Sequence, residues 1–336
     1  MHLPRPRGPL SQAVVDRLRT GPEATLPEQV QAPDQPLSDS DFQLALWVLY
    51  ELSYRGFDDL ADGEDAEWAP DVLAFRALLE EVFEAELRAL VEPRTPDSSE
   101  DIVEAILEIC EGDEDARSMA SYLQRDATVE QFTEYLVAKS VYHLKESDPQ
   151  SFVIPRLSPA VKAALVELQY DEYGDGRPER VHQAIFARAL ESMDLDATYG
   201  AYVDRAPGPV LAENNAMSLF ALHRRLRGAS MGHLAAFEST SSVPCRFVAM
   251  GIRRLELPEE VAAYYDEHVE ADSIHEQVAL RDICARLVAE EPGLADGVLL
   301  GATACIVLEE RATAAILDAW ESGASVLLPD PVGEAA

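Results

Sequence analysis

Apolar residues recur every three to four positions along most of this chain, which is the period of an amphipathic helix. No segment alternates strictly between apolar and polar residues, as a half-buried strand would. The spacing predicts helices over residues 41–52, 70–92, 98–111, 115–124, 129–145, 163–170, 178–193, 209–226, 228–240, 243–255, 257–288 and 293–322. We therefore expect an all-α protein built as a helical bundle.

Polar caps, prolines and glycines mark the ends of these helices. Ser38-Asp-Ser-Asp precedes the first helix, and Gly174 and Gly176 interrupt the chain before Pro178, the expected first residue of helix 178–193. Residues 1–40 are rich in Pro, Gln and polar groups, which predicts a mobile extension with at most one short helix near 10–18. We divide the chain into this extension (1–40), a helical accessory region (41–128), a main helical domain (129–325) and a tail (326–336).

The helix expected over 257–288 carries polar side chains on its apolar stripe. The apolar members of the stripe are Val261, Tyr265, Ala279 and Ile283. His268, Asp272 and His275 continue the same stripe and fall within about 60° of one another around the helix. Burying three such groups is costly unless something satisfies them, and a metal ion would do so. The alternative is a solvated helix face on which the histidines occur by chance.

One helix cannot complete such a site, because metal sites in helical bundles gather ligands from several facing helices. Glu172 and His182 lie on either side of a glycine-containing joint that would let both reach one point. Glu238 ends the small, apolar run Gly232-His-Leu-Ala-Ala-Phe-Glu, and Glu146 closes the helix 129–145. These four residues are the further ligand candidates.

Several neighbouring residues compete with these candidates. The rivals of Glu172, which spacing alone does not exclude, are Glu167, Asp171 and Asp175. His233 rivals His182, but it lies about 140° of helix from Glu238, so the two would not share a face. We interpret His233, His143 and His223 as packing or hydrogen-bonded histidines.

The combination Glu172-x9-His182, Glu238 and His268-x3-Asp272-x2-His275 resembles the haem-oxygenase-like diiron oxidases and oxygenases, a family of iron-containing redox enzymes. The resemblance covers about 130–325. Three segments are similar to the central domain of the N-nitrosourea-forming enzyme of streptozotocin biosynthesis: Gln169-Tyr-Asp-Glu-Tyr-Gly, Leu144-Lys-Glu-Ser-Asp-Pro and Gly232-His-Leu-Ala-Ala-Phe-Glu. Residues 41–128 resemble that enzyme's accessory helices more loosely. We see no C-terminal cupin sequence, which that enzyme uses to form the N–N bond, so the resemblance does not imply nitrosourea formation.

The resemblance implies a haem-oxygenase-like helical bundle, with an N-terminal accessory region, that binds two Fe ions, Fe²⁺ in the reduced form, and uses O2 as co-substrate. Carried over residue by residue, the ligands are Glu172, His182, Glu238, His268, Asp272 and His275. Glu146 stands where the nitrosourea enzyme has an additional carboxylate ligand. A set of carboxylates and imidazoles suits iron better than zinc or magnesium.

Three functions compete at this stage. The family resemblance favours an oxygenase that N-oxygenates an amine in a biosynthetic pathway. The same ligands also suit an oxidase that desaturates or cleaves a C–C bond of a fatty or amino acid. The third is a non-catalytic helical interaction protein that has kept a metal for stability.

The composition of the chain limits the kinds of partner that we expect it to bind. The chain of 336 residues carries 62 acidic and 27 basic residues, a formal charge of −35, which argues against nucleic acid and anionic membranes. No run of about 18 apolar residues suggests a membrane span, and no secretory signal is visible. The scattered Cys110, Cys245, Cys284 and Cys305 are expected as reduced thiols in a cytoplasmic protein. We expect a small-molecule substrate, an external electron donor and a homodimer formed through 41–128.

Overall fold

The computed structural model describes residues 1–92, 99–112 and 115–329, and leaves aside the side chains of residues 99–100 and 270–274. Within these residues the regular secondary structure is entirely helical, which confirms the all-α prediction. The first five α-helices are α1 (Pro9–Thr20), α2 (Ser40–Glu51), α3 (Pro70–Ala89), α4 (Ser99–Cys110) and α5 (Met119–Arg125). The next nine are α6 (Val129–His143), α7 (Asp148–Ser151), α8 (Pro159–Glu172), α9 (His182–Ser192), α10 (Gly208–Leu222), α11 (Arg227–Arg254), α12 (Glu259–Gln277), α13 (Arg286–Glu290) and α14 (Ala295–Glu321).

Short helical turns connect several of these helices. The 3₁₀ turns are η1 (Gly63–Trp68), η2 (Ile154–Arg156), η3 (Gly174–Gly176), η4 (Pro178–Arg180), η5 (Val203–Arg205), η6 (Arg224–Leu226) and η8 (Pro292–Leu294). A π-helix, η7 (Val278–Ala285), continues α12 directly and leads into α13. The helix predicted over 257–288 is therefore three helical segments joined end to end.

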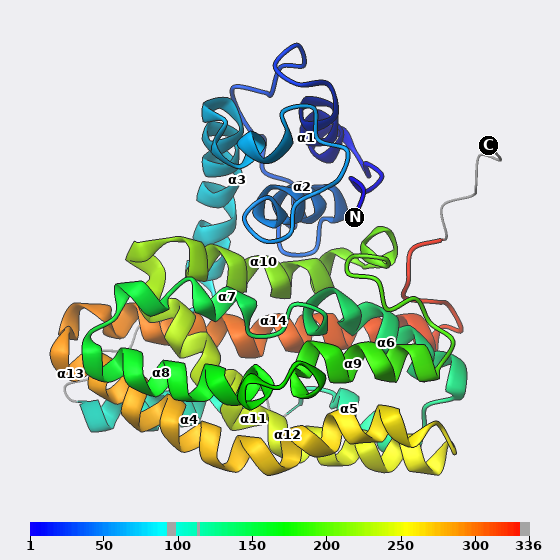
Figure 1. The fold of residues 1–336 in the computed structure, drawn as a ribbon, viewed down its shortest axis with the longest axis vertical. Helices are drawn as coiled ribbons and strands as arrows, with labels where there is room; N and C mark the ends of the chain where they lie inside the picture. The colour runs from blue at the N-terminus through cyan, green and yellow to red at the C-terminus, as the bar shows by residue number, and fades with distance from the viewer. Residues whose placement is uncertain (93–98, 113–114, 330–336) are drawn as a thin grey trace.

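Helices α1–α3 form a cap that sits on α10, above the bundle made by the later helices (Figure 1). We call residues 1–92 the N-terminal cap. The one short helix expected near 10–18 is present as α1, but its packing is at odds with a mobile extension. Val14, Val15 and Leu18 are buried in the same apolar cluster as α2. Arg17 adds ion pairs to Asp62 and Asp71.

Helices α11 and α14 pack against each other at the centre of the bundle. Their backbones approach so closely that a Cβ atom at Gly232 would collide with the carbonyl oxygen of Val298. A Cβ atom at Gly301 would collide with the carbonyl oxygen of Ala229 in the same way. Glycine is required at both positions because no side chain fits between the helices.

By length and composition, the helical segment Pro292–Glu321 could cross a membrane. The sequence analysis predicted no such segment. However, 56% of the qualifying stretch is buried inside the structure. Helix α14 packs against α11, α10 and α4. Packing in the core therefore accounts for much of the apolar surface of this helix.

Helix α11 also differs from the sequence prediction. The two helices expected over 228–240 and 243–255 are one continuous helix that runs through Pro244. Proline removes one backbone hydrogen bond and disfavours a helix interior. Contacts of α11 with α5, α12 and α14 stabilise the helix along its length and outweigh this local preference.

Candidate metal centre

Two groups of buried Glu and His side chains face each other in the bundle. The first group contains Glu146, His182 and His268, and the second group contains Glu172, Glu238 and His275. Within each group, one potential ligand atom from every residue lies within 4.8 Å of the others. The side chains come from the α6–α7 turn, the end of α8, the start of α9, the middle of α11, and α12. The structure thus brings together six of the seven predicted ligands from distant parts of the chain.

Glu172 lies between the two groups. Its Oε2 atom is 3.1 Å from Nδ1 of His182 in the first group. Its Oε1 atom is 3.7 Å from Nδ1 of His275, which also lies 3.4 Å from Oε2 of Glu238. In the first group, Nε2 of His268 lies 3.4 Å from Oε1 of Glu146. One carboxylate therefore has an oxygen directed toward each group.

The joint between α8 and α9 places Glu172 and His182 side by side. Glu172 is the last residue of α8 and His182 is the first residue of α9. Gly174 has φ +67°, and a Cβ atom there would lie 2.5 Å from the backbone of Arg180. Only glycine allows the chain to fold back this tightly. Pro178 begins the 3₁₀ turn η4 rather than α9 itself, which corrects the predicted start of that helix.

Hydrogen bonds orient the two histidines of α12. Nδ1 of His268 lies 2.8 Å from the carbonyl oxygen of Tyr264. A carbonyl oxygen can only accept, so Nδ1 carries the proton and a neutral ring offers Nε2 as a ligand atom. Nε2 of His275 lies 2.8 Å from Oδ2 of Asp171, which leaves Nδ1 directed at the carboxylates. Hydrogen bonds of this kind are the usual outer partners of metal-binding histidines.

Glu146 stands in the turn between α6 and α7. The next residue, Ser147, has φ +67°, so the backbone reverses direction there. The hydroxyl of Tyr264 donates to Oε2 of Glu146, at 2.8 Å, and lies 2.6 Å from Nδ1 of His143. The Ser147 hydroxyl donates to Oε2 of Glu172 at 2.7 Å. The turn therefore contacts both groups at once.

The charges in the centre compensate one another in the absence of metal. Burial by itself would raise the pKa of Glu146, but His268 and His143 outweigh it and the pKa lies well below its ordinary value. The pKa of Glu172 is likewise lowered, because His182 outweighs burial. Burial would lower the pKa of His275, yet its bond to Glu238 and the nearby carboxylates raise it to about 9. The metal-free centre thus favours ionised Glu146 and Glu172 and a protonated His275.

The donor set fits a transition metal such as iron. Oxygen and imidazole donors without cysteine sulfur are the ligand types that iron sites in helical bundles use. Nδ1 of His182 is buried and, within the described parts of the chain, meets Oε2 of Glu172 at 3.1 Å without forming a well-aligned hydrogen bond. A bound ion would be coordinated by this nitrogen and would neutralise the buried carboxylates around it.

The remaining ligand candidates and their rivals differ in how they relate to the two groups. The side chain of Asp272 lies outside the described residues, so its expected place among the ligands stays a prediction. Asp171 is the hydrogen-bond partner of His275, while Glu167 and Asp175 belong to neither group. His233 is fully buried, and this burial lowers its pKa to about 4, as expected for a packing histidine.

Sequence reasoning missed the role of Tyr264, and it described His143 only as a packing or hydrogen-bonded histidine, without its contact with Glu146. Both are buried, and they contact each other and Glu146. Tyr264 precedes His268 by one helical turn, and His143 precedes Glu146 by three residues. These spacings are the only signal that could have found them, and they are too common to be specific.

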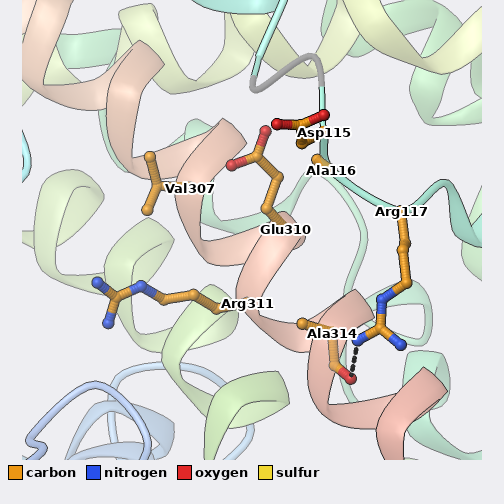
Figure 2. A pocket seen from close by; sticks show the side chains of 7 residues that line it. All are labelled: Asp115, Ala116, Arg117, Val307, Glu310, Arg311 and Ala314. Carbon is orange, nitrogen blue, oxygen red and sulfur yellow. Dashed lines mark hydrogen bonds between the residues drawn. The ribbon is translucent and has the colours of Figure 1, made fainter.

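A surface pocket beside α14 lies away from these groups. It has a volume of about 350 Å³ and none of the seven predicted ligands lines it. Figure 2 shows Arg117 reaching the carbonyl oxygen of Ala314 across this pocket, a bond of 3.1 Å. Arg117 also pairs with Asp318 and Glu321. This pocket is an ion-paired depression on the outside of α14 and is separate from the metal centre.

Fold and site together define a helical bundle that positions buried carboxylates and imidazoles suited to binding iron. A model of the iron-containing redox enzyme family, one of the haem-oxygenase-like groups, matches residues 133–310. The match covers more than half of the chain, and the protein belongs to this family. No curated protein matches the sequence. The likeness to the nitrosourea-forming enzyme therefore stays a prediction.

Proposed function

We propose that the protein is a non-haem diiron oxygenase that reacts with O2 at the two Glu/His groups. The observation that carries this proposal is the position of Glu172, whose two oxygens face His182 on one side and His275 on the other. A carboxylate placed in this way can bind one ion through each oxygen and so hold two ions side by side.

The charge of the centre supports a pair of divalent ions. Glu146, Glu172 and Glu238 are buried and bring three negative charges together. Asp272 would contribute a fourth if it joins them, as the sequence predicts. Two ferrous ions carry four positive charges and would neutralise this set, whereas one ion would leave buried charge uncompensated.

Bound ferrous ions would supply the electrons that reduce O2. The chain's own part is to position ligands and to exclude water. Tyr264 orients Glu146 and His268, and Asp171 orients His275. The ligands are 3–6% exposed, so the centre is shielded from bulk solvent. The proposal includes an external electron donor and a homodimer formed through residues 41–128.

We infer that the substrate is an amine that becomes N-oxygenated. The observation that favours this reaction is the presence of Glu146 in the first group. Its position matches the additional carboxylate of the nitrosourea-forming enzyme that the sequence resembles. The test is to offer amines and fatty acids with isotopically labelled O2 and to locate the label by mass spectrometry. Label on nitrogen supports the inference, and products cleaved or desaturated at carbon would contradict it.

Iron loading tests the proposal as a whole. The protein is loaded anaerobically with Fe(II), bound iron is counted, and the complex is mixed with O2 while the visible spectrum is recorded. We expect about two irons per chain, as in other diiron bundles, and a transient absorbance after mixing. H275A should lose iron with its helical content unchanged, whereas H223A, at a histidine paired with Glu80, should not. Iron that does not bind, or that is inert toward O2, refutes the proposal.

A further inference from the structure

Lys145, the residue before Glu146, extends its side chain into the N-terminal cap. Its Nζ atom lies 3.5 Å from Oε2 of Glu51 and 4.4 Å from the ring centre of Tyr54. The ring centre of Trp47 is 5.6 Å away. The Lys145 side chain is only 2% exposed. These three partners belong to α2 or to the turn that follows it, so the cap surrounds this lysine.

Glu51 is more deeply buried than its partner. Its side chain is 0% exposed. It accepts hydrogen bonds from the Tyr199 hydroxyl, at 2.7 Å, and from the backbone N–H of Arg55, at 3.2 Å. The only positive side chain paired with it within the described part of the chain is Lys145. Removing one member of a buried pair is strongly destabilising because the other charge is left without water.

A second link joins the same part of the cap to the turn. Arg55 donates through Nη2 to Oε1 of Gln183, at 3.0 Å. Nε2 of Gln183 in turn lies 2.9 Å from the carbonyl oxygen of Glu146 and 2.9 Å from Oδ1 of Asp148. The cap therefore contacts the side chain of Lys145 directly and the backbone of Glu146 through Gln183.

Three consecutive side chains of this turn make contacts in different places. Lys145 pairs with Glu51 in the cap, Glu146 joins His268 and Tyr264, and Ser147 donates to Glu172. The left-handed backbone of Ser147 makes the turn tight, so a shift of one residue displaces its neighbours.

We propose that Glu51 and Lys145 are positioning residues through which the N-terminal cap places Glu146 at the first metal group. The inference rests on the proposed iron centre. It makes the cap a structural part of that centre rather than a separate accessory region. The first group should depend on the cap, whereas Glu238 and His275 of the second group, which come from α11 and α12, should not.

The test compares iron binding in wild-type protein and in E51Q, which removes the negative charge while keeping the shape of the side chain. The unpaired ammonium of Lys145 should move toward water and draw the turn with it. We expect iron affinity at the first group to fall by about 10- to 100-fold, the range found when outer partners of metal ligands are lost. Mössbauer spectra of the Fe(II)-loaded protein should then show one of two ferrous sites depleted.

R17M is the matched control. Arg17 is also 2% exposed and paired with two aspartates, but these contacts lie wholly within the cap. R17M should lower the melting temperature of the metal-free protein and keep both irons. Two irons with wild-type spectra in E51Q would overturn the inference, as would equal iron loss in E51Q and R17M.

R55M provides a second variant should E51Q fail to fold. Arg55 is exposed, and R55M keeps the pair of Glu51 and Lys145. It removes the link through Gln183 and the contact of the guanidinium with the ring of Tyr199, 4.3 Å away. We expect a weakening of the first site alone, smaller than in E51Q. An unchanged first site in R55M, together with an unfolded E51Q, would overturn the inference. Wild-type protein that binds no iron refutes the proposed function itself and removes this inference with it.

Discussion

Oε2 of Glu172 lies 3.1 Å from Nδ1 of His182, although one residue ends α8 and the other begins α9. The other oxygen of Glu172 faces His275, which belongs to the second group. Glu172 is therefore the one residue whose two oxygens are directed at different groups within the described centre. The proposed pair of irons depends on it more than on any other single ligand.

The first prediction concerns this shared carboxylate. E172A should abolish iron binding at both groups, because each ion loses a ligand and the buried charge balance changes. E238A should deplete mainly the second group, since Glu238 belongs to that group and pairs with its His275. Iron counting after anaerobic loading measures both effects. E167A, at an exposed position on the same helix, is the control and should bind iron as the wild type does.

The second prediction concerns the hydroxyl of Tyr264. Y264F removes a donor to Glu146 and a partner of His143. Iron affinity at the first group should fall by about 10- to 100-fold. The metal-free protein should lose about 1–3 kcal/mol of stability, because buried polar atoms lose their partner. Y265F removes the buried hydroxyl of the next residue, which belongs to neither metal group, and should bind iron normally. Equal effects in both variants would contradict the assigned role.

The third prediction is a pH dependence of iron loading. The pKa of His275 is raised to about 9 in the metal-free protein, and the pKa of His182 is also raised because Glu172 outweighs burial. Iron must displace these protons, so its apparent affinity should rise by about tenfold per pH unit for each proton released. A pH indicator in weakly buffered solution should record that release. Affinity that does not change between about pH 6.5 and pH 9 would contradict this account.

The same shift predicts how the stability of the metal-free protein varies with pH. The pKa of His275 is higher in the folded protein than its ordinary value of 6.5. Its contribution to the free energy of unfolding is therefore fully present below pH 6.5 and is lost as the pH rises through about 9. Chemical denaturation of the metal-free protein across this range measures the loss. H275A should show a smaller decrease over the same range.

The fourth prediction concerns the contact between α11 and α14. G301A places a methyl group against the backbone of Ala229, which cannot move without separating the helices. We expect a loss of about 3 kcal/mol, at the upper end of the cost of overpacking. G293A, where no atom lies within 4 Å of the added carbon, should change stability by less than about 0.5 kcal/mol. Thermal denaturation distinguishes the two, and a stable G301A would show that the helices can separate at little cost.

The sequence by itself determined the class of the fold. Helical periodicity, caps such as Asp39 before α2, and the absence of alternating segments are local signals, and local hydrogen bonding largely decides where helices form. The polar stripe of α12 was also readable, because His268 and His275 replace apolar residues at positions that must face the core. Glu172, His182 and Glu238 were ligand candidates by their position in the chain, the family resemblance assigned all three as ligands, and the structure places them in the two groups.

Only the tertiary structure decided which of these residues meet. Glu146 was one of several acids at helix ends until the turn at Ser147 directed it toward His268. The continuity of α11 through Pro244 and the packing of α1 onto α2 also depend on contacts between distant segments. The link from Glu51 to Lys145 spans residues that no periodicity relates. The local sequence determines which segments form helices. Which helices pack together depends on the burial of apolar surface and on close packing, and the chain gains this stabilisation only when it has folded.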